Sequence, residues 1–218
     1  MYSFAQRDDL KVVDEPYYAH YLKASGANHP GKEFALEQME TNPIRIHQDM
    51  KTLEEQHGIV FIKNMGHHLI DMDLDFFLDC TNVFLLRSPK QMIASIVKII
   101  PNPIMRDIAL KRQAEVARFL VERNVPVLSI DSNRILRNPT KGLTDLCTAL
   151  HIPFDANMLT WDAGPIEEDG VWAPWWYENV HQSTGFSKSF SENPFPSFSQ
   201  GLLDEALPHY EYLKQFAI

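Results

Sequence analysis

The feature that most constrains this chain is a set of four short aliphatic segments separated by stretches with helical periodicity. These segments cover residues 12–13, 59–62, 83–86 and 125–130. The second and third are nearly continuous apolar runs, which is typical of parallel strands covered on both faces. Strands that alternate with helices indicate βαβ units, so the sequence predicts an α/β fold with a mostly parallel sheet flanked by helices.

The starts of three helices can be recognised from their capping residues. Ser88 is predicted as an N-cap, with Pro89 at the first helical position and Gln91 closing a capping box. Asn-Pro pairs at residues 102–103 and 138–139 are predicted to open the next two helices. Met1 to Arg7 is also predicted to be helical, with no strand before it.

The character of the chain changes near residue 160. All four tryptophans lie between Trp161 and Trp176, and the spacing of Trp172, Trp175, Trp176 and Val180 predicts one helix packed on the sheet. Residues 183–200 are rich in Ser and Phe and predict a long ordered loop, followed by a closing helix. We expect one domain over residues 1–218, with 160–200 as an aromatic-rich elaboration.

Composition narrows the classes of partner and compartment. A net charge of −9 disfavours nucleic acid as a partner, because lysine and arginine supply most of the affinity for phosphate backbones. Cys80 and Cys147 are predicted to be buried free thiols in helical segments, which fits a reducing compartment. No apolar run approaches about 18 residues and no signal pattern is visible, so we expect a cytoplasmic protein without membrane association.

Two strand ends carry candidate chemistry. Asp14 and Glu15 follow the first strand, where a carboxylate faces the ligand crevice of an open α/β sheet and could act as a general base. The alternative is that one of them caps a helix opened by Pro16. Lys63 follows the second strand and could neutralise developing charge, or could lie in a solvated loop.

The segment after Lys63 offers two further possibilities. His67 and His68 could act as a base or bind an oxygen of the transferring group. Three aspartates follow at alternating positions and could be a metal cluster, but their alternation with apolar residues favours the solvated face of a helix start. They are Asp71, Asp73 and Asp75. We therefore expect no metal.

Arg87 and the aromatic stretch are the remaining candidates. Arg87 ends the strongest strand and Ser95 lies two turns into the next helix, which suits either an anion site or a structural ion pair. In the segment containing Gly170 and Trp172, core packing competes with stacking of an aromatic ring on a nucleotide base.

Several motifs in order resemble a bacterial sulfotransferase-like family with the three-layer fold of P-loop NTPases. The similarity covers nearly the whole chain. The motifs are Tyr2-Ser3-Phe4-Ala5-Gln6-Arg7, Asp14-Glu15-Pro16-x-Tyr18-Ala19, Ile62-Lys63-Asn64-Met65-x-His67-His68, Leu86-Arg87-x-Pro89, Asp169-Gly170-x-Trp172, Trp176-Tyr177 and Ser183-Thr184-Gly185-Phe186.

The resemblance implies transfer of a sulfuryl group from 3′-phosphoadenosine 5′-phosphosulfate (PAPS) to a hydroxyl or amine of a small-molecule acceptor. It implies that Arg87 and Ser95 bind the 3′-phosphate, with Gly170 and Trp172 completing the nucleotide site. For the base, it implies either Glu15 or a histidine beside Lys63. We favour Glu15 as base and Lys63 as charge stabiliser.

The chain departs from this family at its start. Members carry a Gly/Arg/Ser-containing phosphosulfate loop, preceded by the first strand, immediately before the segment that corresponds to Tyr2–Arg7. Neither feature is in this sequence, nor is a Walker-type phosphate loop. We therefore expect the chain as given to be truncated or inactive. The alternatives are a non-catalytic binding or scaffold protein that kept the fold, or a small-molecule kinase of related topology.

Overall fold

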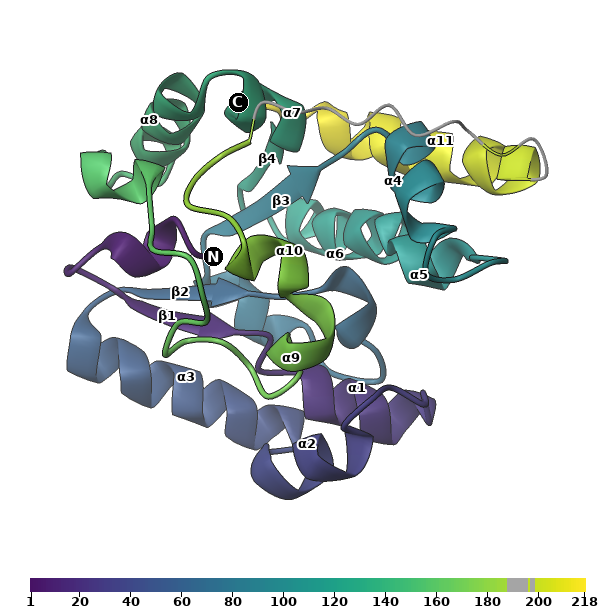
Figure 1. Ribbon diagram of the computed structural model, residues 1–218, viewed down its shortest axis with the longest axis horizontal. Coiled ribbons are helices and arrows are strands. Elements are labelled where there is room, and N and C mark those ends of the chain that lie inside the picture. The colour runs from purple at the N-terminus through teal and green to yellow at the C-terminus, as the bar shows by residue number, and fades with distance from the viewer. Residues whose placement is uncertain (188–195, 197–198) are drawn as a thin grey trace. The chain divides into compact units, whose positions relative to one another are not determined.

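The computed structural model describes residues 1–187, 196 and 199–218, and it confirms an α/β fold (Figure 1). Packing divides the chain into two compact units, Met1–Asp73 with Asp155–Ser187 and Leu74–Phe154 with Lys188–Ile218. Each unit contains a parallel pair of strands. The single domain over residues 1–218 stays a prediction, as do the three-layer arrangement and the missing first strand.

The first unit is built around β1 (Lys11–Asp14) and β2 (Val60–Lys63). The strands are parallel, with Lys11 opposite Val60 and Asp14 opposite Lys63. Because the register is in phase, the last residues of both strands lie together at one edge. The helices between them are α1 (Tyr18–Ser25), α2 (Lys32–Gln38) and α3 (Pro43–His57), and β2 is followed by a 3-10 turn, η2 (Gly66–His68).

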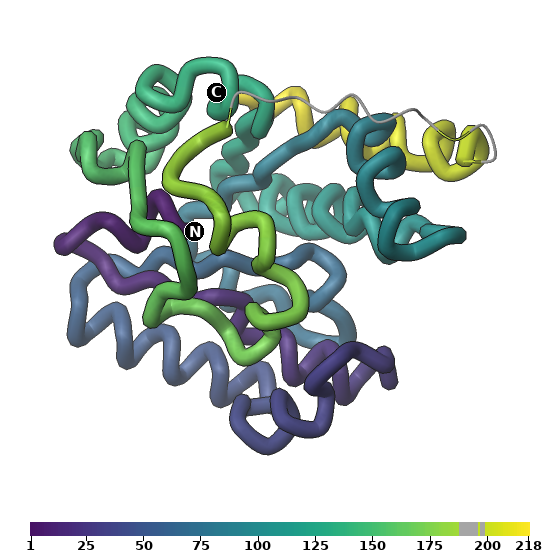
Figure 2. The backbone as a smooth tube through the Cα atoms, viewed as in Figure 1, coloured from purple at the N-terminus to yellow at the C-terminus, as the bar shows by residue number. Residues whose placement is uncertain are grey.

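The beginning of the chain packs against a segment that is distant in sequence. Only one 3-10 turn, η1 (Phe4–Gln6), forms where a longer helix was predicted. Ser3 Oγ donates to the carbonyl of Met158, within η4 (Ala156–Leu159), at 2.7 Å, so the two segments lie side by side (Figure 2). The ring of Phe4 stacks on that of Phe61 with centroids 4.1 Å apart, which fixes this turn over β2.

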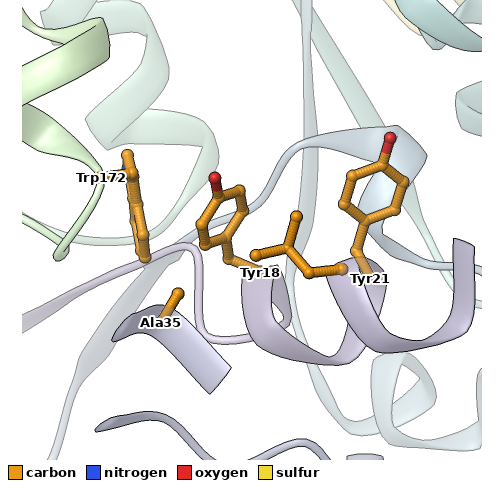
Figure 3. Packing of buried hydrophobic residues seen from close by; sticks show 5 residues of the cluster. Tyr18, Tyr21, Ala35 and Trp172 are labelled. Carbon is orange, nitrogen blue, oxygen red and sulfur yellow. The ribbon is translucent and has the colours of Figure 1, made fainter. Parts of the chain in front are cut away.

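An aromatic core in the first unit joins three helical segments. Tyr18 and Tyr21 from α1 pack with Ala35 from α2 and with Trp172, which directly precedes α9 (Ala173–Trp176). Figure 3 shows the indole of Trp172 beside the ring of Tyr18, above Ala35. α10 (Glu178–His181) follows α9. The segment Asp155–Ser187 is therefore anchored to the strand-bearing part of the same unit.

The second unit contains β3 (Asn82–Leu86) and β4 (Val127–Asp131), which pair in parallel with Asn82 opposite Val127. Its helical elements are η3 (Asp75–Asp79), α4 (Pro89–Ile96), α5 (Met105–Ile108), α6 (Leu110–Glu122), α7 (Ser132–Arg137), α8 (Pro139–Ala149) and α11 (Gln200–Lys214). α6 and α11 pack against each other (Figure 1). Ser129 of β4 also donates its hydroxyl to the carbonyl of Leu213, at 2.9 Å.

The strand predictions are confirmed in position but not in burial. All four predicted segments contain a strand, and both pairings are parallel. However, Val83 and Leu85 of β3 are 36% and 58% exposed. The expectation that this strand is covered on both faces is therefore wrong for the described residues.

The predicted helix starts fare differently. α4 begins at Pro89 after Ser88 as predicted, but the side chain of Ser88 makes no cap hydrogen bond. The second Asn-Pro pair does cap α8, since Asn138 accepts from the amide of Lys141. The first pair does not open a helix: α5 begins at Met105, and Ala109, with φ 57°, separates it from α6.

The remaining predictions concern cysteines, the late loop and membrane spans. Cys147 is a buried free thiol in α8, whereas Cys80 is a half-buried free thiol at the end of η3. The predicted loop over residues 183–200 falls largely outside the described residues, and α11 confirms the closing helix. Within the described residues, no helix has the length and apolarity needed to cross a bilayer.

Candidate functional site

The site begins where β1 and β2 end. Glu15 directly follows β1 and has φ 42°, a left-handed conformation that non-glycine residues rarely adopt. Its amide donates to the carbonyl of Lys63 at 2.8 Å, which continues the strand pairing by one residue. Such strain persists only where surrounding contacts impose it, and it concentrates at functional sites.

A compact ionic cluster fills this edge. The Lys63 ammonium lies 3.2 Å from Asp14 Oδ1 and also bonds Glu15 Oε1. The side chains of Asp14 and Glu15 are 1% and 7% exposed, and that of Lys63 is 26% exposed. Burial raises the pKa of Glu15, and the opposing effect of Lys63 does not cancel it. Glu15 is therefore a stronger base than an exposed glutamate.

These contacts contradict the predicted helix cap. α1 begins at Tyr18 with Tyr17 as its N-cap residue, and no side chain caps it. Pro16 therefore does not open a helix, and both carboxylates face Lys63 instead. The alternative that Lys63 lies in a solvated loop is wrong for the same reason, since it is the last residue of β2.

Tyr177 ties the cluster to the Asp155–Ser187 segment. Its hydroxyl lies 2.7 Å from Lys63 Nζ and 2.7 Å from Asp14 Oδ2, and it accepts from Trp172 Nε1 at 3.3 Å. Tyr177 lies in one of the sequence motifs that resemble the family, but it was not predicted as a site residue. An aromatic residue next to two tryptophans gives no signal in the sequence that distinguishes a polar role from packing.

Gly170 and Trp172 support the cluster from the same segment. The amide of Gly170 donates to Asp14 Oδ2 at 3.3 Å. A Cβ at Gly170 would lie 2.0 Å from the indole of Trp172, so only glycine fits beneath that ring. Trp172 is 2% exposed and packs on Tyr18 with centroids 4.7 Å apart. Because Trp172 is buried, its indole has no open face on which a nucleotide base could stack. Core packing, the other role considered for Trp172, is the one that the structure supports.

The two histidines lie behind the cluster. His68 is 2% exposed, and its Nδ1 is 3.7 Å from Glu15 Oε2. Burial holds the pKa of His68 well below its ordinary value, so the ring is neutral and the contact is not an ion pair at neutral pH. His67 packs edge-on against His68 and Tyr21, with centroids 4.5 and 5.1 Å away. The structure thus brings both predicted histidines beside the aromatic core.

A second polar group adjoins the cluster. The hydroxyl of Tyr2 donates to Asp169, with both carboxylate oxygens at 2.8 Å, and His181 Nε2 lies 2.9 Å from Asp169 Oδ2. Burial raises the pKa of Tyr2, and the hydrogen bond to Asp169 raises it further. None of these three residues was predicted as a site residue, although Tyr2 and Asp169 lie in the sequence motifs that resemble the family.

A pocket of about 280 Å³ opens between these groups, entirely within the first unit. Four of its eight lining residues are aromatic, and the eight include Lys63 and Tyr177. The lining residues are Met1, Tyr2, Ser3, Lys63, Trp161, Tyr177, Val180 and Phe186. A small organic molecule with a polar group could therefore meet Lys63 and Tyr177 there.

Trp175 and Trp176 do not pack as predicted. They are 48% and 42% exposed, because α9 is a single short helix whose buried residue is Ala173. Only Trp172 joins the core. Of the three aspartates considered as a metal cluster, Asp75 begins η3. Among the described residues, no three His, Cys, Asp or Glu side chains are grouped to hold a metal.

The predicted anion site lies in the second unit. Arg87 directly follows β3 and is half-buried, and Ser95 lies within α4. Within the described part of the chain, the guanidinium of Arg87 makes no hydrogen bond or salt bridge. The alternative of a structural ion pair is therefore not supported among the described residues.

Comparisons with known proteins give a family match, two relatives and a structural neighbour. A family profile described as "Sulfotransferase domain" matches residues 1–217. Two Arabidopsis thaliana proteins, branched-chain-amino-acid aminotransferase-like proteins 2 and 1, are 37% and 38% identical over 98% of this chain. The chain spans only 38% and 39% of their lengths. The solved sulfotransferase domain from the Synechococcus PCC 7002 olefin synthase is 14% identical, with a TM-score of 0.48, covering 90% of this chain and 92% of that one.

Proposed function

Because this chain belongs to the sulfotransferase domain family, we propose that it transfers a sulfuryl group from PAPS to a hydroxyl or amine of a small molecule. The observation that carries the proposal is the buried Glu15–Lys63 pair, which a strained backbone holds at the carboxyl ends of two parallel strands. Open α/β sheets bind their ligands at such strand ends.

Glu15 is proposed as the general base. Its raised pKa brings the carboxylate closer to the affinity for protons that base catalysis near neutrality requires. It lies directly behind Lys63, which lines the pocket, so an acceptor bound to Lys63 is one hydrogen-bonded group away. His68 is a weaker candidate for the base. It is buried against Glu15 Oε2, the carboxylate oxygen that does not bond Lys63, and it is not among the residues that line the pocket.

The proposed step forms a bond between the acceptor oxygen or nitrogen and sulfur. The bond between sulfur and the bridging oxygen of the phosphosulfate breaks, and adenosine 3′,5′-bisphosphate leaves. The proton of the acceptor passes to Glu15. The ammonium of Lys63 neutralises negative charge that develops on the leaving oxygen, which lowers the barrier most in a site shielded from water.

Arg87 and Ser95 are proposed to bind the 3′-phosphate. A guanidinium at a strand end that has no partner among the described residues, followed by the start of the eight-residue helix α4, suits a doubly charged oxyanion. The phosphosulfate end needs further donors, which the family resemblance places before Tyr2. Measurements are therefore made on the protein as its gene encodes it.

Replacement of Arg87 tests donor binding. We expect Arg87→Ala to weaken the binding of adenosine 3′,5′-bisphosphate by about 2 kcal/mol, or roughly thirtyfold in Kd, because it removes charge-assisted hydrogen bonds. Isothermal titration calorimetry measures this change. Arg112→Ala is the matched control, since Arg112 lies on α6 of the same unit and pairs with Glu115 at the surface.

The outcomes separate the alternatives. Unchanged affinity in Arg87→Ala would remove Arg87 from the nucleotide site. If the unmodified protein is stably folded but has no affinity for the bisphosphate, the result favours the alternative of a non-catalytic binding or scaffold protein.

A further inference from the structure

Tyr177 occupies a position that the proposed chemistry does not yet use. It lies between α9 and α10, and the three shortest contacts of its hydroxyl are with polar groups from three parts of the first unit. These are the Lys63 ammonium at the end of β2, the Asp14 carboxylate at the end of β1 and the Trp172 indole. No other described hydroxyl contacts Lys63.

The hydrogen-bonding capacity of the phenol fixes the direction of each bond. An ammonium and an indole N–H can only donate, so the Tyr177 oxygen accepts from both Lys63 and Trp172. Its single proton then goes to Asp14 Oδ2 at 2.7 Å, which also accepts from the amide of Gly170, because the other carboxylate within reach, Glu15 Oε1, lies farther away at 3.5 Å. The phenol thus uses both of its acceptor positions and its single proton.

The titration behaviour of the phenol agrees with this assignment. Burial raises the pKa of Tyr177, and the charges of Glu15 and Asp14 raise it further. Tyr177 therefore does not itself become a base near neutral pH. Its contribution is geometric: the oxygen is a third acceptor that holds the ammonium beside the two carboxylates.

We propose that Tyr177 is a positioning residue that sets the orientation of the Lys63 ammonium at the pocket wall, and that it links this orientation to the Gly170–Trp172 turn. Both Lys63 and Tyr177 line the pocket, and the Tyr177 ring also lies 5.1 Å from Lys63 Nζ. The catalytic consequence rests on the proposed function. The placement of Lys63 does not, and can be measured without turnover.

The test compares the reactivity of lysines in the folded protein. Each lysine is acetylated with an activated ester at pH 8 and quantified by peptide mass spectrometry, with exposed Lys23 as the internal reference. In Tyr177→Phe the ammonium loses one acceptor while the ring remains. We expect the ratio of Lys63 to Lys23 acetylation to rise about tenfold, since a hydrogen bond to a charged group is worth at least that factor.

Tyr18→Phe is the matched control. Tyr18 is a tyrosine of the same unit that is more deeply buried than Tyr177, and its hydroxyl bonds His29 at 3.1 Å and not Lys63. We expect its acetylation ratio to stay within twofold of the unmodified protein. A ratio within twofold in Tyr177→Phe overturns the positioning role, as does an equal rise in both variants, which would indicate general loosening.

The failures of the two proposals are distinguishable. If PAPS is consumed, the positioning role further predicts a lower kcat in Tyr177→Phe with unchanged affinity for adenosine 3′,5′-bisphosphate. If PAPS is not consumed but the acetylation ratio rises, the proposed function fails and the positioning of Lys63 stands.

Discussion

Replacing Lys63 with methionine is expected to lower the free energy of unfolding by about 3–5 kcal/mol at pH 7, because it leaves two buried carboxylates without their cation. Asp14 and Glu15 are nearly inaccessible to water, and Lys63 is the cation that both contact. Methionine keeps much of the length of the side chain, so lost packing contributes little. Urea unfolding followed by circular dichroism measures the change.

The control and the contrary result are clear. Lys23→Met removes an exposed lysine whose ammonium bonds Thr41, and we expect a change within about 0.5 kcal/mol. If Lys63→Met is no more destabilising than Lys23→Met, the cluster is solvated and its proposed electrostatics are wrong.

The pH dependence of the same variant has a definite sign. Burial already raises the folded-state pKa of Glu15 above its ordinary value of 4.5, and loss of Lys63 removes an opposing effect. A carboxyl whose folded pKa is raised stabilises the fold below its unfolded pKa and loses that contribution as pH rises. The deficit of Lys63→Met relative to the unmodified protein should therefore shrink below about pH 4.5.

The second large effect concerns Glu15. We expect Glu15→Gln to lower kcat by about 10²–10⁴-fold, because the amide cannot accept the proton of the acceptor. Affinity for adenosine 3′,5′-bisphosphate should change less than about threefold, since Glu15 is not proposed to contact the nucleotide. Kinetics of bisphosphate release and calorimetry of its binding give the two quantities.

His68 provides the internal comparison for this result. If Glu15→Gln retains full turnover while His68→Asn loses it, the base is the histidine and the assignment of Glu15 is wrong. A loss of turnover accompanied by an equal loss of nucleotide affinity would instead indicate that the substitution disrupts the site as a whole.

The strands could be predicted because their signal is local. Short runs of aliphatic and β-branched residues at 59–62 and 83–86 favour strands by themselves, and both runs overlap a strand. The parallel pairing followed from the helices between them. The exposure of Leu85 could not be predicted, because whether a strand face is covered depends on elements far away in the sequence.

The site could be predicted only in part for a similar reason. Glu15 directly follows β1 and Lys63 is the last residue of β2, so their meeting follows from strand order and register. Tyr177 reaches them from a segment more than 100 residues away, in a run of aromatic residues where packing is the simpler interpretation. The cap predicted at Asp14 or Glu15 failed because a tertiary partner, Lys63, competes with the local amides.

The most direct test of the central claim is the fate of radioactive sulfur from ³⁵S-labelled PAPS, with ATP offered in a parallel reaction. The account predicts that the protein as its gene encodes it releases adenosine 3′,5′-bisphosphate and passes ³⁵S to an acceptor in equal amounts, that Glu15→Gln abolishes both, and that no ADP forms. ADP formation from ATP without use of PAPS, or transfer of ³⁵S that persists in Glu15→Gln, would contradict it.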